Sequence, residues 1–357
     1  MNILITAPNL DPNKNVSGVS SVVNLIINSN SLHHYSHYLL GRPDKKLTKL
    51  SWLYYTIKQI LLFPFAIKKN NIDLIHQNLP FNLNGVLREV FITFWSSLMK
   101  KPIFLHVHGG SFLMDGTKNI LINKICTYIL KKSSLIVVLS EVEKNSIENN
   151  FNVKNVKILV NCVDTNIFKL KGKKSFNTKP NILFLGRTHE SKGIQDIVEA
   201  FKLLKQNTDF SFSLCGKGPL LEYFKTECDK ILGEDFKYYG VVSGEDKISI
   251  LEDSDYFILP SRYGEGLPIA LLESMSMGLV PIVTDDASMK YIIQNEVNGI
   301  IIQKSNPQDL YEKLKKILLN IPLSKSISAN AAETIRGSYN VKNYILSLNS
   351  LYSSIIS

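Results

Sequence analysis

The chain has 357 residues, of which 45% are apolar, and it carries a formal net charge of +10. This length exceeds what one hydrophobic core usually holds and therefore predicts two domains. The four cysteines are scattered without a C-x-x-C pair, which excludes a common zinc site or disulfide framework and favours a reducing, cytoplasmic compartment.

Short apolar runs alternate with helix-like segments, the pattern of parallel sheets with crossover helices. We predict strands in the first half at 2–6, 73–76, 103–106, 135–139 and 157–160. In the second half we predict strands at 181–185, 211–214, 237–239, 256–259, 280–283 and 299–302. The expectation is an α/β protein with two doubly wound domains, 1–168 and 169–338, joined by a lysine-rich hinge at 168–180. The C-terminal helix in 339–357 can pack back on the first domain.

The charge excess lies entirely in the first half. Residues 1–170 contain 19 Lys and Arg against 9 Asp and Glu, whereas residues 171–357 contain 22 of each class. An anionic partner such as lipid head groups, a phosphorylated acceptor or nucleic acid would explain this excess, and so would solubility alone. Within this half, residues 47–69 mix aromatic side chains with lysines. They form either a basic helix on an anionic membrane surface or an ordinary amphipathic helix packed on the sheet.

Two features argue against membrane insertion. The N-terminal apolar run is too short for a signal peptide and meets Pro8 at once. The longest apolar segment, 50–67, is interrupted by Lys58, Gln59 and Pro64. We therefore expect no spanning helix.

Two candidate sites follow strands of the first half. Gly18, after Ser17, opens a helix behind the first strand, where free backbone N–H groups favour an anion. His106 and His108 alternate along another strand, so their side chains share one face. His108 is nearer the carboxyl end of the strand and precedes Gly109-Gly110, so it can face a cleft. A histidine at a strand end is more often structural than catalytic, and the second histidine and the two glycines narrow that difference.

Two further loops follow strands of the second half. Gly186-Arg187 and Lys192-Gly193 place two cations just beyond a strand, where they can hold a phosphate or lie solvated on the surface. Gly216 and Gly218 flank Lys217 after the next strand and allow close approach of the backbone to a ligand.

The most informative segment is Gly264-Glu265-Gly266-Leu267-Pro268, with Glu273 eight positions after Glu265. A glycine-rich turn that leads into a helix offers free N–H groups to a phosphate. Carboxylates beside such a site are better suited to accept hydrogen bonds from hydroxyls. Phosphate together with hydroxyls indicates a nucleotide-sugar.

These pieces together resemble the family 4 glycosyltransferases of the GT-B fold, in which two Rossmann-like doubly wound domains face a central cleft. Glu265 and Glu273 match the E-x7-E pattern of that family, and the glycine-bearing loops after Leu185 and Cys215 match its donor loops. One departure is Cys162, which stands where the family has the glycine of an Asn-Gly-Val-Asp turn.

The resemblance implies a role for each matched residue. Arg187 and Lys192 would neutralise the diphosphate, Glu265 would bind hydroxyls of the donor sugar, and Glu273 would bind the ribose. Backbone N–H groups of Gly266 and Leu267 would hold sugar or phosphate. His108 would stabilise the reacting centre, and Gly18, Gly186, Gly216 and Gly218 would line the donor.

The resemblance implies a retaining, metal-independent enzyme with no cofactor, which moves a sugar from a UDP-sugar to a glycan or lipid-linked acceptor of bacterial surface polysaccharide. We expect the enzyme in the cytoplasm, with a possible peripheral contact to the anionic inner membrane. We expect no nucleic acid among its partners. A GDP-sugar-dependent mannosyltransferase and a UDP-sugar epimerase of the same fold stay open, the latter needing carboxylates such as Asp115 or Glu141. A non-catalytic protein that binds anionic polymers also stays open.

Two other enzyme classes fit less well. A metal-dependent GT-A transferase would need an Asp-x-Asp after a strand, but Asp253-Ser254-Asp255 precedes one, and we interpret it as a solvated turn. Asp285-Asp286 has the wrong spacing. A glycoside hydrolase would need a closer carboxylate pair than eight helical residues allow, since these span about 12 Å.

Overall fold

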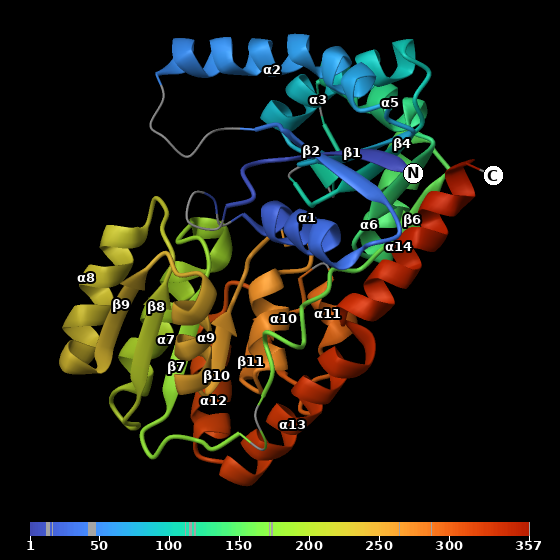
Figure 1. The fold of residues 1–357 in the computed structure, drawn as a ribbon. Helices are drawn as coiled ribbons and strands as arrows, with labels where there is room; N and C mark the ends of the chain where they lie inside the picture. Colours follow the sequence, from blue (N-terminus) through green and yellow to red (C-terminus); the bar gives the residue numbers. More distant parts are fainter. Residues whose placement is uncertain are drawn as a thin grey trace. The chain divides into compact units, whose positions relative to one another are not determined.

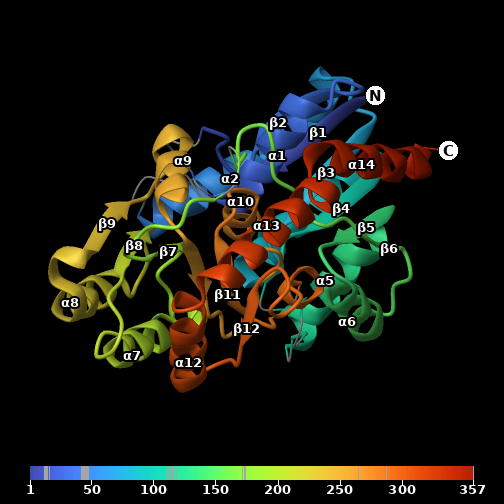
Figure 2. The ribbon, with the colours of Figure 1, turned by 90° about the horizontal axis from the view of Figure 1, so that it is seen from below.

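The computed structural model describes residues 1–356 except 12–14, 16, 42–47, 111, 114, 115, 118, 171, 173, 264 and 287, and the side chain of Lys49. It divides into unit 1, Met1–Asn161 with Val341–Ser357, and unit 2, Cys162–Asn340. Both are α/β units with helices around a parallel sheet (Figures 1 and 2). The predicted fold class of two doubly wound units is therefore confirmed.

The chain enters unit 2 earlier than the predicted boundary at 168/169 and leaves it later than 338/339. Val163 pairs with Asn340, and the hydroxyl of Ser276 donates to the carbonyl of Phe168, so residues 162–168 pack on unit 2. The predicted hinge at 168–180 also contacts unit 2, because the backbone N–H of Asn177 donates a hydrogen bond to Asp255. Residues 171 and 173 of that hinge lie outside the described residues.

Unit 1 is built on a six-stranded sheet in the order β2-β1-β3-β4-β5-β6. The strands are β1 (Asn2–Ala7), β2 (His34–Leu39), β3 (Leu74–Leu79), β4 (Ile103–Val107), β5 (Leu135–Val138) and β6 (Val156–Ile158). Strand β2 is absent from the predicted set. Its sequence, HYSHYL, contains no apolar run, and it lies at the edge of the sheet with most side chains at least partly exposed.

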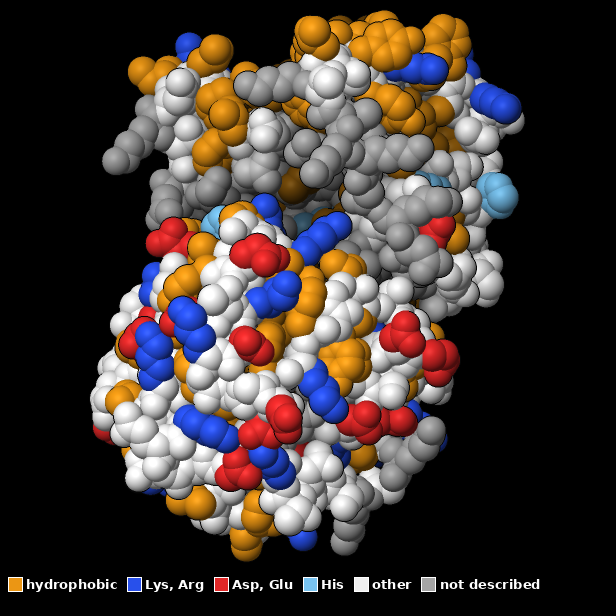
Figure 3. All heavy atoms as spheres, turned by 90° about the vertical axis from the view of Figure 1, so that its left-hand side faces the viewer, with side chains coloured by type: hydrophobic (Ala, Val, Ile, Leu, Met, Phe, Trp, Pro, Cys, Tyr) orange, Lys and Arg blue, Asp and Glu red, His pale blue; other side chains and the backbone are white. Residues whose placement is uncertain are grey.

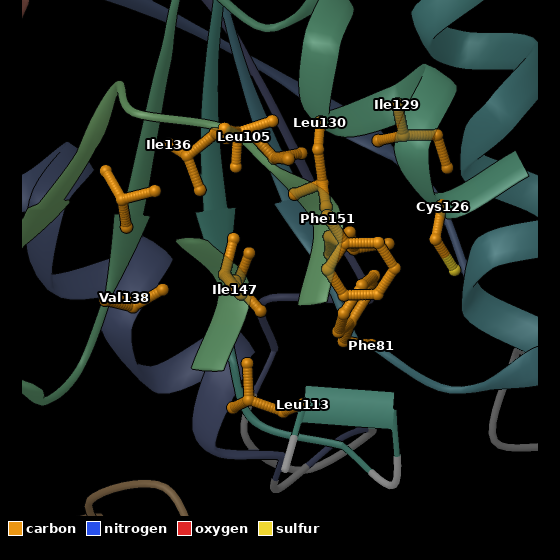
Figure 4. Close-up of a cluster of buried hydrophobic side chains, with 14 of the residues drawn as sticks. Phe81, Leu105, Leu113, Cys126, Ile129, Leu130, Ile136, Val138, Ile147 and Phe151 are labelled. Atoms are coloured by element: carbon orange, nitrogen blue, oxygen red, sulfur yellow. The ribbon is translucent and has the colours of Figure 1, made fainter. Parts of the chain in front are cut away.

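The helices of unit 1 are α1 (Gly18–Ser29), α2 (Lys49–Lys69), α3 (Leu83–Leu98), α5 (Ile120–Lys132), α6 (Glu141–Phe151) and α14 (Val341–Ile356). One core cluster joins β3, β4 and β5 to α5 and α6, with Leu105, Ile136, Ile147 and Phe151 near its centre (Figure 4). The sheet is apolar on the faces that these helices cover, which explains the continuous buried runs of β4 and β5.

The C-terminal helix α14 belongs to unit 1 although unit 2 precedes it in the chain, and it lies beside the N-terminal elements (Figures 1 and 2). Tyr344, Leu348 and Tyr352 are its buried side chains. The hydroxyl of Tyr352 lies 2.6 Å from Nδ1 of His76 on β3, and Asn30 donates to Asn349 over 2.7 Å. Unit 1 is therefore completed by the last residues of the chain.

Unit 2 has a six-stranded sheet in the order β12-β11-β10-β7-β8-β9. Its strands are β7 (Asn181–Leu185), β8 (Ser211–Cys215), β9 (Phe236–Gly240), β10 (Tyr256–Leu259), β11 (Val280–Thr284) and β12 (Ile300–Ile302). Its helices are α7 (Ile194–Leu204), α8 (Leu221–Leu232), α9 (Gly244–Asp253), α10 (Ile269–Ser276), α11 (Met289–Ile292), α12 (Pro307–Leu318) and α13 (Ile321–Ser338). Two short 3-10 turns, Glu190–Lys192 and Gly233–Asp235, complete it.

One helix differs from expectation in its apolar character. By length and composition alone, Leu50–Lys69 in α2 could cross a membrane, with a mean hydropathy of 1.2, and only 17% of that window is buried. The apolar residues around Lys58, Gln59 and Pro64 are thus enough to meet a criterion of length and composition, and the expectation that no helix spans a membrane stays a prediction.

Candidate active site

The loops that follow the strands of unit 2 meet at one edge of its sheet, because all its strand pairs are parallel. The chain runs outward from β7 to β8 and β9, returns to the other side of β7, and continues outward from β10 to β12. The order therefore reverses between β7 and β10, and sheets of this kind bind ligands at the reversal. Lys192 follows β7 and Glu265 follows β10, so the two predicted motifs are neighbours.

Glu265 is fixed at this reversal by groups from three loops. Its Oε1 lies 2.5 Å from Nζ of Lys192 and also accepts a hydrogen bond from the hydroxyl of Ser261. Its backbone N–H donates to Oδ2 of Asp286 over 3.1 Å. Within the part of the chain that the structure describes, Oε2 accepts no hydrogen bond. Glu265 is thus held firmly through one oxygen and can offer the other to a ligand hydroxyl.

Asp286 and Lys304 extend this ion network along the edge, and the sequence analysis assigned no role to either. Asp286 follows β11, Lys304 follows β12, and Nζ of Lys304 lies 2.5 Å from Oδ1 of Asp286. Lysine and carboxylate side chains therefore line the ends of β7, β10, β11 and β12 in the order +, −, −, +. The spacing in sequence is irregular, so only the sheet order could have identified the set.

Glu273 lies on α10, buried, with Oε1 2.5 Å from Nζ of Lys247 on α9. Burial raises the pKa of Glu273, and the ammonium of Lys247 opposes that rise. The same ammonium lies 4.9 Å from the centre of the Phe168 ring. Because α10 begins only at Ile269, Glu265 precedes the helix, and the predicted helical spacing between the two carboxylates is wrong.

Arg187 contrasts with these paired cations. Its side chain is exposed and makes no hydrogen bond or ion pair to any residue that the structure describes. Nearby Arg262 is not available in the same way, since it makes two hydrogen bonds to Asp196, of 2.8 and 3.0 Å. Arg187 is therefore the cation beside the reversal that can bind an anion without breaking an existing pair.

The glycines of these loops are required by the packing of backbone on backbone. A Cβ on Gly216 would lie 1.8 Å from the carbonyl oxygen of Gly186, and one on Gly218 would lie 2.3 Å from that of Thr188. At Gly193 the corresponding distance to the Pro260 oxygen is 2.1 Å. The sequence analysis attributed Gly216 and Gly218 to ligand approach, whereas here they bring the loops after β7 and β8 together. Gly186 itself leaves room, with no atom nearer than 3.7 Å.

The other residues of the glycine-rich motif, 264 and 266–268, immediately precede α10. Leu267 is buried, Gly266 is partly buried, and Gly264 lies outside the described residues. Pro268 precedes the first residue of α10 without a side-chain cap. The predicted glycine-rich turn into a helix is therefore present, with the helix beginning one residue later than expected.

In unit 1, His106 and His108 lie on the same face of β4, as predicted, with ring centres 4.0 Å apart. His106 is fully buried, and its Nδ1 lies 3.4 Å from Nε2 of His76. His108 is partly accessible, so it is the member of the pair that a ligand can reach. Burial lowers the pKa of His106 and His76 well below the usual value and that of His108 to about 3, so all three are neutral near pH 7.

The tautomer of His108 follows from its neighbour Asn78. Nδ2 of Asn78 donates to the carbonyl of Thr6 over 2.7 Å, which fixes the orientation of the amide. Oδ1 of Asn78, 2.6 Å from Nε2 of His108, must then accept a hydrogen bond from that nitrogen, which therefore carries the proton. Nδ1 of His108 consequently carries a lone pair and acts as a hydrogen-bond acceptor.

Gly18 begins α1 as predicted, and the hydroxyl of Ser17 caps the helix by accepting from the N–H of Ser20 over 3.2 Å. Gly18 is exposed and follows β1, two strands from β4 in the sheet. The first turn of α1 carries no acidic residue, which leaves its N-terminus suited to an anion.

Two positions weighed for other reactions have structural roles. Asp255 is buried and accepts hydrogen bonds from the backbone of Asn177 and Asn181, so the prediction of a solvated turn is wrong there. Burial raises its pKa. Glu141 begins α6, is exposed, and lies 3.3 Å from Nζ of Lys144, while Asp115 lies outside the described residues. Among the described residues no cluster of three or more His, Cys, Asp or Glu is arranged to hold a metal, and all four cysteines are free and buried.

Comparisons with known proteins point to glycosyltransferases. Residues 166–334 match the family described as glycosyl transferases group 1. An uncharacterized glycosyltransferase of Methanocaldococcus jannaschii is 26% identical over 307 residues, which cover 82% of this chain and 78% of the relative. N,N'-diacetylbacillosaminyl-diphospho-undecaprenol alpha-1,3-N-acetylgalactosaminyltransferase of Campylobacter jejuni is 27% identical over 163 residues, 44% of this chain and 41% of the relative.

Two solved structures share the fold over the whole length. Sucrose-phosphate synthase from Thermosynechococcus elongatus has a TM-score of 0.82 at 15% identity and covers 99% of each chain. HepE of Anabaena, solved in complex with UDP, has a TM-score of 0.77 at 14% identity, with 99% of this chain and 100% of that chain covered. Residues 166–334 therefore match the glycosyl transferases of group 1, and the two doubly wound units share the GT-B fold of glycosyltransferases.

Proposed function

We propose that this chain transfers a sugar from a UDP-sugar to a hydroxyl of a lipid-linked glycan, with retention of anomeric configuration and without a metal. The observation that carries the proposal is the Lys192–Glu265 pair at the strand-order reversal of unit 2. It joins a cation suited to a diphosphate with a carboxylate suited to sugar hydroxyls. Membership of family 4 within the larger family stays a prediction.

On the donor side, the charge that develops on the departing nucleoside diphosphate needs cations in place. Arg187 supplies one that no described residue occupies, and Lys192 supplies a second that Glu265 holds in position. Glu265 would accept from sugar hydroxyls through Oε2, and Glu273 from the ribose. UDP as the nucleotide is supported by the UDP complex of HepE, which shares the fold.

From unit 1 we assign His108 the role of an acceptor at Nδ1. A neutral imidazole whose Nε2–H is held by Asn78 cannot act as a general acid, but it can accept a hydrogen bond from a sugar hydroxyl and orient that sugar. With leaving-group charge held by the cations of unit 2 and sugar hydroxyls by its carboxylates, the proposed reaction needs no metal to stabilise charge.

The acceptor proposal rests on the relative from Campylobacter jejuni, whose name specifies a diphospho-undecaprenol acceptor. We propose a lipid-linked precursor of a bacterial surface polysaccharide, glycosylated at the cytoplasmic face of the inner membrane. The basic charge of unit 1 is consistent with a phosphorylated acceptor.

The decisive variant is Glu265→Gln, which keeps the size of the side chain and removes its charge. We expect transfer to fall by about 10³-fold, since preorganised groups of this kind contribute roughly 3–4 kcal/mol. The matched control is Glu296→Gln, which alters a Lys–Glu pair of 2.6 Å in the same unit, on its exposed surface. Ordinary turnover by the Glu265 variant, with an unchanged circular dichroism spectrum, would exclude this site.

Four further measurements distinguish the proposed reaction from the alternative nucleotides, mechanisms and enzyme classes. Thermal shifts with UDP and GDP identify the nucleotide, because a ligand at 100 times its Kd adds about 2.7 kcal/mol. NMR of the product reports the anomeric configuration, and EDTA tests the need for a metal. Interconversion of the donor sugar without acceptor would favour the epimerase.

A further inference from the structure

The outer side of α2 is apolar where a helix packed on a sheet would be polar. Gln59, Phe63 and Ile67, four residues apart, are its buried residues and face the sheet. On the opposite side, exposed apolar side chains run from one end of the helix to the other at Leu50, Tyr54, Ile57, Leu61 and Phe65, with Lys58 and Lys68 at the margin of this row. The helix is thus neither an ordinary amphipathic helix nor a buried one.

Helix α3, which packs beside α2, buries several polar side chains together with Val86 and Ile92, and its large exposed side chains are apolar. Glu89, Thr93 and Ser96 are fully buried, and Gln77 of β3 donates to Glu89 over 2.9 Å while it accepts from Thr93 over 3.1 Å. The exposed face of α3 carries Leu83, Leu87, Phe91, Phe94 and Leu98. This inversion is the pattern of a helix whose outer side does not face water.

We refer to these ten exposed side chains of α2 and α3 as the apolar face. Apolar side chains gather at the α2 end of unit 1 in Figure 3, at the top of the view, with cationic side chains among them.

The charges around the apolar face have one sign. Helices α2 and α5 contain no acidic residue, and the single acid of α3, Glu89, is buried. Exposed lysines flank the face on α2 and on α5, which packs beside α3: Lys58, Lys68, Lys69, Lys124, Lys131 and Lys132. Apolar side chains with a lysine border, on three helices that expose no acid, complement the surface of an anionic bilayer.

We propose that the apolar face docks unit 1 on the surface of an anionic lipid bilayer, with α2 lying in the plane of the interface. Spanning is disfavoured because Phe63 and Ile67 hold α2 against the core of unit 1 along the same length that would have to cross the membrane. The inference extends the membrane location in the proposed function but does not depend on the donor or on the reaction. It also explains why the charge excess lies in the first half of the chain.

The test is cosedimentation of the full chain with vesicles, without nucleotide or acceptor. Wild-type protein should bind vesicles of phosphatidylcholine with 30% phosphatidylglycerol at least tenfold more tightly than vesicles of phosphatidylcholine alone, and less tightly at high salt. The triple variant Leu61→Gln, Phe65→Gln, Phe91→Gln should lose at least tenfold in binding. The control Leu319→Gln changes a side chain of unit 2 that is 68% exposed, as Phe65 is, and should bind as wild type does.

Three outcomes would overturn the proposal. One is equal binding by the triple variant and wild type, or no binding by wild type. Another is a wild-type dimer that the triple variant abolishes in analytical ultracentrifugation, which would make the face an interface between two copies. The third is retention in cell membranes after alkaline carbonate extraction, which would make α2 a spanning helix. Because transfer to a soluble acceptor analogue is measured separately, loss of vesicle binding with transfer intact leaves the proposed reaction standing.

Discussion

In unit 2 the carboxylates of Glu265 and Glu273 each pair with a lysine at the functional edge of the sheet, whereas unit 1 places three neutral histidines at and behind its corresponding strand end. Unit 2 thus keeps charge inside in compensated pairs and has a net charge near zero. Unit 1 keeps its interior uncharged around these histidines and carries its positive charge outside. Under the two proposals made above, this difference corresponds to a division of labour, with donor recognition by the paired charges of unit 2 and bilayer recognition by the apolar face of unit 1.

The largest effect on stability should come from removing only one partner of a buried lysine–carboxylate pair. Lys247→Met leaves the buried carboxylate of Glu273 without its cation, which costs about 4 kcal/mol in the free energy of unfolding. Hydrogen exchange should speed up in β10 and β11 of unit 2. The fluorescence transition should change less, because both tryptophans, Trp52 and Trp95, belong to unit 1.

The double variant Lys247→Met, Glu273→Gln is the control, since it removes the uncompensated charge and should recover most of the lost stability. If the single variant unfolds as wild type does, the pair contributes nothing, and the comparison between the units fails for Glu273.

A smaller effect tests the histidines of unit 1. The pKa of His106 is lowered by burial, so the folded state resists protonation, and the stability it contributes is present above pH 6.5 and is lost as pH falls. Between pH 7 and pH 5 one such histidine removes about 2 kcal/mol from the free energy of unfolding. The variant His106→Leu should therefore lose about 2 kcal/mol less than wild type in the free energy of unfolding between pH 7 and pH 5. Denaturant unfolding followed by tryptophan fluorescence measures both losses.

The measured quantity is the difference in slope between the two proteins, so any constant cost of the substitution cancels. Parallel pH profiles would show that His106 titrates normally and that the histidines are not held neutral by burial.

The smallest effect concerns the outer part of the ion network. Asp286→Asn can still accept the N–H of Glu265 but loses its pairing with Lys304. We expect transfer to fall about tenfold, equivalent to about 1.4 kcal/mol, through a looser Glu265. The conservative variant Lys304→Arg should retain most activity, whereas an unchanged kcat in Asp286→Asn would limit the site to Glu265 and Lys192.

The sequence predicted the parts of the molecule in which local pattern and tertiary environment agree. Most of the predicted strands are apolar runs that the sheets bury, whereas β2 is an exposed edge strand with no such run, and β9, although predicted, is also largely exposed. Glu265 and Lys192 were recognisable because glycines surround them. Asp286, Lys304 and Lys247 carry no motif and reach the site only through strand order and the packing of α9 on α10.

The surface of unit 1 likewise could be predicted only in part from the sequence. The aromatic and lysine content of 47–69 suggested a membrane helix, but the inversion of α3 could not be predicted from the sequence. Its apolar residues would ordinarily be assigned to the core, and only the buried contacts of Gln77, Glu89 and Thr93 show which side faces inward.

The return of α14 to unit 1 has a consequence for the order of assembly on the ribosome. Unit 2 is complete in sequence once residue 340 has emerged, whereas unit 1 lacks the hydroxyl partner of His76 until Tyr352 follows. The part of the chain made first is therefore finished last, and unit 2 folds as an insertion within an unfinished neighbour. A chain that stops shortly after residue 340 would contain all of unit 2 and a unit 1 that lacks α14.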